Sequence, residues 1–330
     1  MKPLLSNCSI AFSLCVLLCA APFSATASTA KATTTPKIDE IKLWRANAQL
    51  QQIAKKINPL GRPAGDGALG LNRRFPDRVL VSHQLEGWNW IRAGVALSNG
   101  FIIDRGIMAF EWAFARMGED GSFGESKTVE ISHFLGLYAR SVLMLRSAKF
   151  DDRAARLARL SPRLEASLRS SRSLLGERRW NGEEMKSWVT HQRVQAAAAA
   201  YWIGQLLVNP GLGKTAEVWL NEALKRQEGT GFFPSGFPPN SKAAFQAQLD
   251  TLESLQGLAL RDSLLGLKLR APILNGYKWA EKSPHFEAGK KMSPKATVSI
   301  ATLVTVASYG AWTGSKVATG FVANQIRTTK

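Results

Sequence analysis

Cysteine is missing from all but the first part of this sequence. The three cysteines, Cys8, Cys15 and Cys19, lie within the first 27 residues. Without that segment the chain can form no disulfide and has no thiol nucleophile or thiolate metal ligand. The remaining 303 residues (330 − 27) must therefore be held together by their apolar core alone.

The apolar run near the start of the chain is too short to cross a bilayer. It spans residues 10–21, follows the positively charged Lys2, and precedes the small residues Ala25 and Ala27. This pattern is typical of a secretory signal peptide rather than of a membrane-spanning helix. We therefore predict a signal peptide over residues 1–27, a periplasmic or secreted protein, and no integral membrane segment.

The sequence also lacks the motifs of metal and nucleotide sites. The four histidines stand far apart, so none forms a pair with the spacing of metal ligands. No phosphate-binding glycine loop and no nucleophile elbow is present. We expect neither a metal nor a cofactor.

Acidic residues are few. The signal segment contains one lysine and no acid, which leaves 42 basic and 25 acidic residues, a net charge of about +17. For an exported protein, this charge favours an anionic polysaccharide or the cell envelope over nucleic acid as a partner. Alternatively, the charge serves solubility and marks no specific partner.

Strand-like alternation is scarce, and helical periodicity fills most of the chain. We predict helices over 40–58, 84–97, 101–117, 128–147, 151–175, 184–208, 213–228, 241–268 and 295–307. A helix that ends in a glycine and a phenylalanine occurs twice, over 110–123 and 218–233. Such repetition is typical of a fold that repeats one helical hairpin. We therefore expect an all-α protein, an α/α barrel (toroid) of repeated hairpins over 40–330, preceded by a flexible lead-in over 28–39. The alanine-rich stretch 194–208 suits an inner helix.

Several motifs between residues 85 and 265 resemble those of one enzyme family. They are Ser187-Trp188-Val189-Thr190-His191-Gln192-Arg193 before the alanine-rich helix, Arg226-Gln227 before a glycine-rich loop, and Ala244-Phe245-Gln246-Ala247 after it. Together they resemble bacterial exported α/α-barrel polysaccharide lyases that act on glucuronan or alginate. The resemblance implies cleavage of a uronate polymer by β-elimination. The family pattern places a tyrosine before the glutamine, whereas this chain has Phe245, which puts the proton-abstracting group in doubt.

One face of the predicted helix 184–208 has the composition of a sugar site. Glu184, Trp188, His191, Gln195 and Trp202 are spaced so that they form a single stripe. Indole rings stack on sugar rings, while the polar groups bind hydroxyls and carboxylates. In the alternative interpretation the first turn is solvated and both tryptophans belong to the core.

A lyase must neutralise the uronate carboxylate, remove the adjacent proton and protonate the leaving oxygen. Arg193, Gln246 or a protonated Glu184 could bind the carboxylate, and His191 could serve as base or acid. On an ideal helix Arg193 lies on a different face from His191. The spacing alone therefore assigns neither carboxylate binding to Arg193 nor proton transfer to His191.

Two other charged segments allow a functional and a structural interpretation. Asp120 and Glu125 flank a turn and could line the cleft of a hydrolase, although solvated acids at a helix end are the simpler interpretation. The arginines of 153–163 predict a solvated outer helix. Alternatively, they form a positively charged binding surface for a polyanion or for lipid headgroups at the envelope.

The function we predict is an exported lyase that cleaves an acidic polysaccharide, with Glu184 and His191 as catalytic residues. The residues expected to bind substrate are Trp188, Arg193, Gln195, Gln246, Asp120 and Glu125. The alternatives are a non-catalytic polysaccharide-binding protein of the same fold and a glycoside hydrolase.

Overall fold

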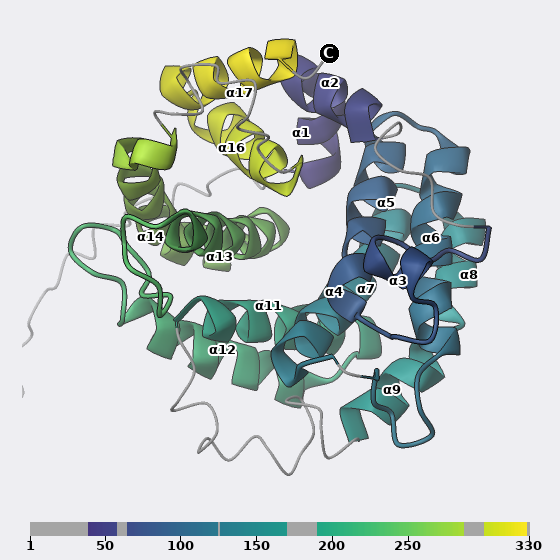
Figure 1. Ribbon diagram of the computed structural model, residues 1–330. Helices are drawn as coiled ribbons and strands as arrows, with labels where there is room; N and C mark the ends of the chain where they lie inside the picture. Colours follow the sequence, from purple (N-terminus) through teal and green to yellow (C-terminus); the bar gives the residue numbers. More distant parts are fainter. Residues whose placement is uncertain (1–38, 58–64, 125, 170–189, 287–299, 329–330) are drawn as a thin grey trace, which may run out of the picture. The chain divides into compact units, whose positions relative to one another are not determined.

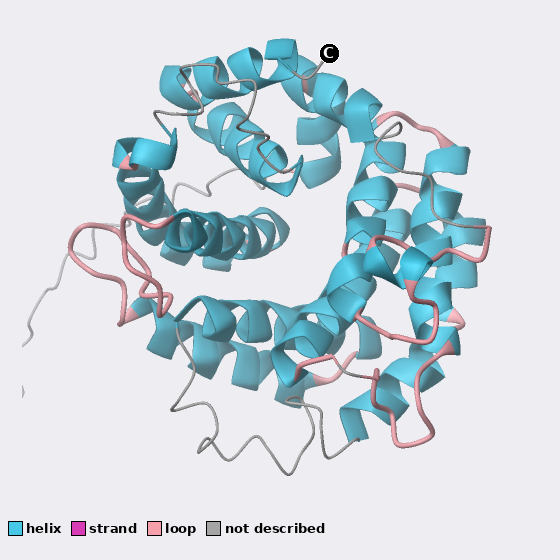
Figure 2. Ribbon diagram, in the orientation of Figure 1, coloured by secondary structure: helices cyan, strands magenta, loops and turns pink. Residues whose placement is uncertain are grey.

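The computed structural model describes residues 39–57, 65–124, 126–169, 190–286 and 300–328 (Figure 1). Every regular element in these ranges is an α-helix, and no strand occurs in them (Figure 2). The prediction of an all-α fold is therefore confirmed. The chain divides into two units, Met1–Thr34 and Thr35–Lys330, and all described residues belong to the second. The predicted signal peptide lies outside the described residues.

The helices follow one another along the chain in the order of their labels in Figure 1. They are α1 (Glu40–Ala46), α2 (Ala48–Ile57), α3 (Leu71–Arg74), α4 (Val81–Gln84), α5 (Glu86–Ala96), α6 (Gly100–Ala115), α7 (Thr128–Ser147), α8 (Asp151–Ala158), α9 (Ser161–Arg169), α11 (Thr190–Leu207), α12 (Pro210–Leu224), α13 (Lys242–Arg261), α14 (Ser263–Lys282), α16 (Ile300–Thr313) and α17 (Lys316–Thr328). Among these described helices, none combines the length and apolar content that a membrane span requires.

Consecutive helices pack as hairpins. The pairs are α5 with α6, α7 with α8, α11 with α12, α13 with α14, and α16 with α17 (Figure 1). We call the first helix of each pair the leading helix and the second the return helix. The leading helices contact one another in the order α5, α7, α11, α13, α16, and both α1 and α2 contact α16 and α5. The series of neighbouring helices therefore closes on itself.

The alanine-rich stretch forms a leading helix, α11, and it packs closely against α7. A Cβ atom added at Gly136 of α7 would lie only 2.6 Å from the Cα of Ala199. The five alanines 196–200 are all buried. Small side chains on both helices therefore allow their backbones to approach.

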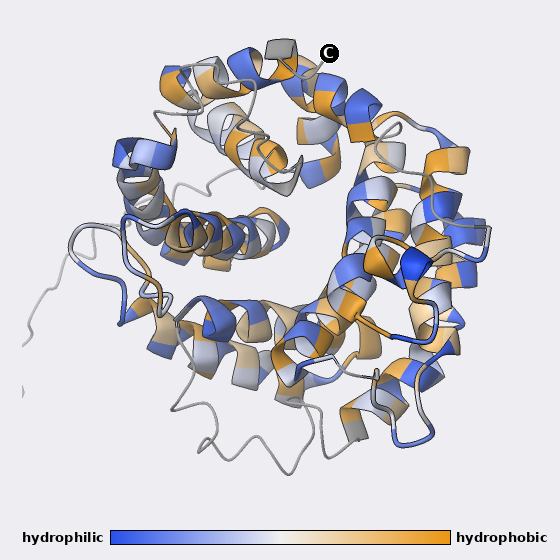
Figure 3. Ribbon diagram, in the orientation of Figure 1, coloured by the Kyte–Doolittle hydropathy of each residue, from blue (hydrophilic) through white to orange (hydrophobic). Residues whose placement is uncertain are grey.

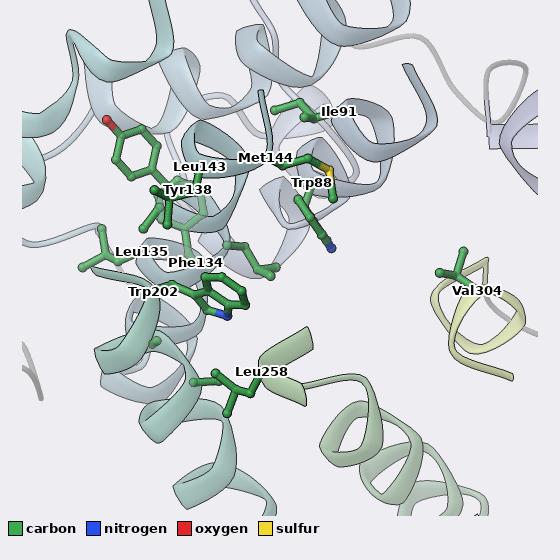
Figure 4. Packing of buried hydrophobic residues seen from close by; sticks show 14 of the residues in the cluster. Trp88, Ile91, Phe134, Leu135, Tyr138, Leu143, Met144, Trp202, Leu258 and Val304 are labelled. Atoms are coloured by element: carbon green, nitrogen blue, oxygen red, sulfur yellow. The ribbon is translucent and has the colours of Figure 1, made fainter. Parts of the chain in front are cut away.

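The core combines two kinds of side chain. Around α6 and α7, Phe110, Phe114, Phe123, Phe134 and Tyr138 are fully buried and contact one another at ring-centroid distances of 5.0–5.9 Å. Figure 4 shows part of this packing together with tryptophans of α5 and α11. Hydrophilic residues are interspersed along the helices, as α13 shows in Figure 3. The leading helices also bury polar side chains, among them Arg92 of α5, Arg140 of α7 and Gln248 of α13.

Some predicted helix boundaries were wrong. The predicted helix 241–268 is two helices, because Asp262 accepts hydrogen bonds from the backbone N–H groups of Leu264 and Leu265 and caps α14. Helix α14 then continues through Pro272 to Lys282, where no helix was predicted. The predicted helices 40–58 and 151–175 also each divide, at Asn47 and at residues 159–160.

The repeated loop is present in both predicted copies. Gly121 and Gly231 have φ angles of 77° and 94°, a conformation that favours glycine. In the first loop the N–H of Gly118 donates to the carbonyl of Ser122. In the second loop the N–H of Glu228 donates to the carbonyl of Phe232. Each loop precedes a leading helix and contains a phenylalanine that is completely buried. This residue is Phe123 in one copy and Phe233 in the other.

A third copy precedes α5, and the sequence pattern did not predict it. Gly67 has φ 99°, and the N–H of Leu69 donates to Oε1 of Gln84 at 2.8 Å. The Gln84 amide donates in turn to the carbonyls of Gly67 and Ala109, at 3.2 and 3.1 Å. This clamp ties the loop to α4, which carries Gln84, and to the return helix α6, which carries Ala109.

The loop at Gly231 uses the same clamp. The N–H of Phe233 donates to Oε1 of Gln248 at 3.0 Å, and the Gln248 amide donates to the carbonyls of Gly231 and Gly276. In both copies the glutamine follows the clamped residue by 15 positions. At the same distance after Phe123, Tyr138 instead donates its hydroxyl to the carbonyl of Leu157.

Gly231→Ala should lower the free energy of unfolding by more than about 2 kcal/mol, which denaturant unfolding would measure. A left-handed backbone costs a residue with a Cβ about 1–2 kcal/mol, and here the methyl group would also overlap the carbonyl of Asn275. The matched control is Gly229→Ala, because a Cβ there meets nothing within 4 Å. Equal effects of the two changes would contradict this account of the loop.

Candidate functional site

A cavity of about 420 Å³ opens where α1, α7, α11 and α13 meet. Its wall includes Glu40 and Lys42 of α1, Arg140 of α7, Trp202 of α11 and Arg261 of α13. Small-molecule sites in proteins commonly have volumes of about 300–1,000 Å³. The cavity therefore has room for a small ligand, and its wall combines one indole with groups of both charges.

Arg140 is the buried charge at the base of this cavity. Its side chain is 4% exposed. Nη1 donates to Oε1 of Glu253 at 2.9 Å, and Nη2 donates to Oε1 of Glu40 at 2.8 Å. Because Glu40 lies on α1 and Glu253 on α13, one guanidinium links three helices that are far apart in the sequence.

A second buried guanidinium extends the network to α5. Nη1 of Arg92 donates to the same Oε1 atom of Glu253, at 3.2 Å, and Nη2 donates to Oδ1 of Asn89. Asn89 in turn donates to Oε2 of Glu86 at 2.8 Å. The result is a continuous chain of polar contacts from α1 through α7 and α13 to α5.

Indole rings cover the two guanidinium groups. Cζ of Arg140 lies 4.6 Å from the ring centroid of Trp88 and 5.3 Å from that of Trp202. Cζ of Arg92 lies 5.4 Å from Trp88 and 5.5 Å from Trp44. Cation–π contacts of this kind stabilise a buried cation by about 2 kcal/mol when water is excluded. Figure 4 shows Trp88 and Trp202 among the buried side chains.

A glycine makes room for Arg140 on α13. A Cβ atom at Gly257 would lie 2.6 Å from Cζ of Arg140. Glu253 and Gly257 are four residues apart and share a face of α13. That face therefore supplies both the carboxylate partner and the space for the guanidinium.

Several buried donors at this cluster have no acceptor. Within the described part of the chain, Nε of Arg92, Nε of Arg140 and Nε1 of Trp88 lack hydrogen-bond partners. An unpaired buried donor costs about 1–3 kcal/mol, and more when it is charged. Among the side chains that carry these donors, Arg140 also lines the cavity.

The carboxyl groups on α13 have opposite pKa shifts. Burial raises the pKa of Glu253, but attraction by Arg140 and Arg92 outweighs burial, so its pKa lies below the ordinary value. Burial raises the pKa of Asp250 to about 6, with Glu253 adding to the rise. Nε2 of Gln246 donates to Oδ1 of Asp250 at 2.8 Å, and Oε1 of Gln246 accepts from Thr302 of α16 at 3.1 Å.

The stripe predicted on α11 is only partly described. Gln195 and Trp202 line a narrow cleft together with His133, Arg140 and Glu253, so these two predicted residues reach the cluster. His191 lies one turn before Gln195 on the same face. Its Nδ1 is buried and has no partner among the described residues, and burial lowers the pKa of its imidazole. Glu184 and Trp188 lie outside the described residues.

The other predicted site residues do not gather at the cavity. Nη1 of Arg193 pairs with Glu222 of the return helix α12 at 3.4 Å. Asp120 accepts from the N–H and hydroxyl of Ser122 and shapes its own turn. Gln246 lies on the face of α13 that carries Asp250 and Glu253. Glu125 lies outside the described residues.

The arginine run of 153–163 packs against α6. Arg153 pairs with Asp104 and Arg156 with Glu111, each through Nε and Nη2 to both carboxylate oxygens. Arg163 donates to the carbonyl of Phe114. Arg153 and Arg156 therefore hold α8 against α6, and Arg163 joins α9 to the same helix.

The residues that form the buried network were not predicted. Arg140 interrupts the apolar stretch 134–145, and Arg92 stands between Ile91 and Ala93. A single charge inside an apolar helical stretch is a signal for a paired buried charge. That signal does not identify the partner, because Glu253 is more than a hundred residues from either arginine.

No family model, curated protein or solved structure matches this chain. The resemblance to polysaccharide lyases therefore rests on the motifs at 187–193, 226–227 and 244–247. Within the described ranges, no three His, Cys, Asp or Glu side chains lie together as metal ligands would.

Asp250→Asn should remove a pH dependence of stability. Because the folded pKa, about 6, exceeds the ordinary value of 3.8, Asp250 favours the folded state at low pH. That contribution is lost as the pH rises from about 4 through 6, at a cost on the order of 2–3 kcal/mol. The variant should therefore be more stable than the wild type above pH 6 and similar to it near pH 4.

Urea unfolding at several pH values measures this difference. The exposed Asp77→Asn change controls for the loss of one carboxylate. A difference between Asp250→Asn and wild type that stays constant from pH 4 to pH 7 would refute the assignment.

Proposed function

We propose that this chain is an exported carbohydrate-binding protein with an α/α-toroid fold, in which the leading helices surround a site for an acidic polysaccharide. The closed series of hairpin contacts supports the toroid. The glycine loop recurs three times, and in two copies a glutamine amide bonds the loop to a return helix, which supports the repetition of one hairpin unit.

The observation that carries the proposal is the presence of an indole and one partly unsatisfied guanidinium group in the wall of the cavity. Trp202 and Arg140 both line it, and Nε of Arg140 has no acceptor among the described residues. A sugar ring offers an apolar face to an indole and hydroxyl oxygens to buried donors. Lys42 and Arg261 on the wall supply positive charge for a uronate carboxylate.

Calorimetry with a short oligoglucuronate and the neutral cello-oligosaccharide of equal length tests this function. The acidic oligosaccharide should bind more tightly, and its affinity should fall with added salt, because exposed charges are screened beyond about 8 Å at physiological ionic strength. Arg261→Gln should weaken binding about three- to tenfold. The same change at exposed Arg159, outside the cavity, should have no effect. Equal binding of the neutral oligosaccharide would contradict the proposal.

β-Elimination is a second candidate function. The environment of His191 favours it. A lowered pKa keeps the imidazole neutral at neutral pH, and its unpaired Nδ1 could accept a proton. His191 shares a helix face with Gln195 and Trp202, which line the cleft at Arg140. This arrangement would supply the base that Phe245 cannot.

Product analysis separates the two functions. A lyase leaves an unsaturated uronate that absorbs ultraviolet light, a hydrolase gives reducing ends without that absorbance, and a binding protein gives neither. If the chain is a lyase, His191→Ala should lower turnover by about 10²–10⁴ and leave oligoglucuronate affinity nearly unchanged. Unsaturated product at the wild-type rate from this variant would exclude His191 as the base.

A further inference from the structure

The contact between Arg140 and Glu40 differs from the bidentate arginine–carboxylate pairs of α8 and α6. Arg153 and Arg156 each use Nε and Nη2 together, so that one edge of the guanidinium holds both oxygens of a carboxylate. On Arg140, Nη2 donates to Oε1 of Glu40 and Nε donates to nothing in the described chain. Glu40 therefore occupies only half of an edge that can hold a whole carboxylate.

Glu40 is also the less firmly held of the two carboxylates on Arg140. The two side chains are similarly exposed, 17% for Glu40 and 15% for Glu253, but among the described residues Arg140 is the one hydrogen-bond donor to Glu40. Glu253 accepts from both Arg140 and Arg92. If Glu40 turned away, Arg140 would keep Glu253 and its two indole contacts, so the buried cation would not be left without a partner.

The position of Glu40 places this half-used edge beside the cavity. Asp39, Glu40, Ile41 and Lys42, at the start of α1, all line the cavity. Helix α1 is held further along, by Trp44, which is 2% exposed, and by Arg45, which donates to the carbonyl of Val95. The Glu40 side chain can therefore move without detaching the helix.

We infer that the Nε–Nη2 edge of Arg140 is the anchor for the ligand's carboxylate, and that Glu40 occupies this anchor until the ligand replaces it. The inference rests on the proposed function and names its anionic subsite. A two-oxygen contact is stronger and more directional than the single bond that Glu40 makes. Glu40 would then set specificity, because a neutral sugar cannot compete with its carboxylate.

Glu40→Gln tests the inference. The amide has the same shape but lacks the charge, so it should compete less well for the guanidinium. The variant should bind a short oligoglucuronate about tenfold more tightly than the wild type, and the cello-oligosaccharide no more tightly. The matched control is Glu111→Gln, which removes a carboxylate from the Arg156 pair outside the cavity and should change neither affinity. Circular dichroism establishes that each variant is folded, and Glu40→Asp, with a shorter carboxylate, provides a second variant.

The outcomes separate this inference from the proposed function. If the wild type binds oligoglucuronate and Glu40→Gln binds equally or more weakly, the anchor is refuted and the function stands. If the wild type binds no glycan but Glu40→Gln gains melting temperature with D-glucuronate and not with D-glucose, the anchor stands and the proposed function fails. If neither protein binds either probe, both are refuted.

Discussion

The burial of two guanidinium groups among the leading helices is the constraint that shapes the centre of this protein. A charge removed from water is costly unless it is paired and hydrogen-bonded. Here Glu253 serves Arg92 and Arg140 at once, while Trp44, Trp88 and Trp202 cover their faces. Because these residues come from α1, α5, α7, α11 and α13, the network forms only when the hairpins have assembled. The same requirement leaves unpaired donors beside a cavity, which is the basis of the proposed glycan site.

A second device, a glycine loop, recurs in the segments that precede α5, α7 and α13. In three loops a glycine with positive φ lets the chain turn, and a buried Leu69, Phe123 or Phe233 follows it. In two of them a glutamine amide bonds the loop and the return helix together, and these contacts fix each hairpin internally. The ion network acts between hairpins, so the two devices have separate roles.

The sequence predicted helical hairpins, the close packing of α11 and two of the three glycine loops, because these depend on local periodicity and glycine placement. The third loop has the same Asp-Gly pair at 66–67 as at 120–121, but Leu69 in place of a phenylalanine concealed it. The boundary between α13 and α14 at Asp262 was not predicted, because it depends on the capping hydrogen bonds of that one side chain. The candidate site could not be predicted in full, since the partners of Arg140 are Glu40 and Glu253, which no local pattern connects. Of the predicted site residues, Gln195 reaches the cluster, while Arg193 is paired with Glu222.

The free energy of unfolding of Glu253→Gln, measured by urea denaturation, tests the central role of the ion network most directly. Removing one member of a buried ion pair typically costs about 3–5 kcal/mol, because the remaining charge is left unpaired. Glu253→Gln should fall in that range, whereas Glu217→Gln, in an exposed pair with Lys268 at 4.0 Å, should cost less than about 1 kcal/mol. A loss below about 1 kcal/mol for Glu253→Gln would show that the two guanidinium groups do not depend on it, and would contradict the account.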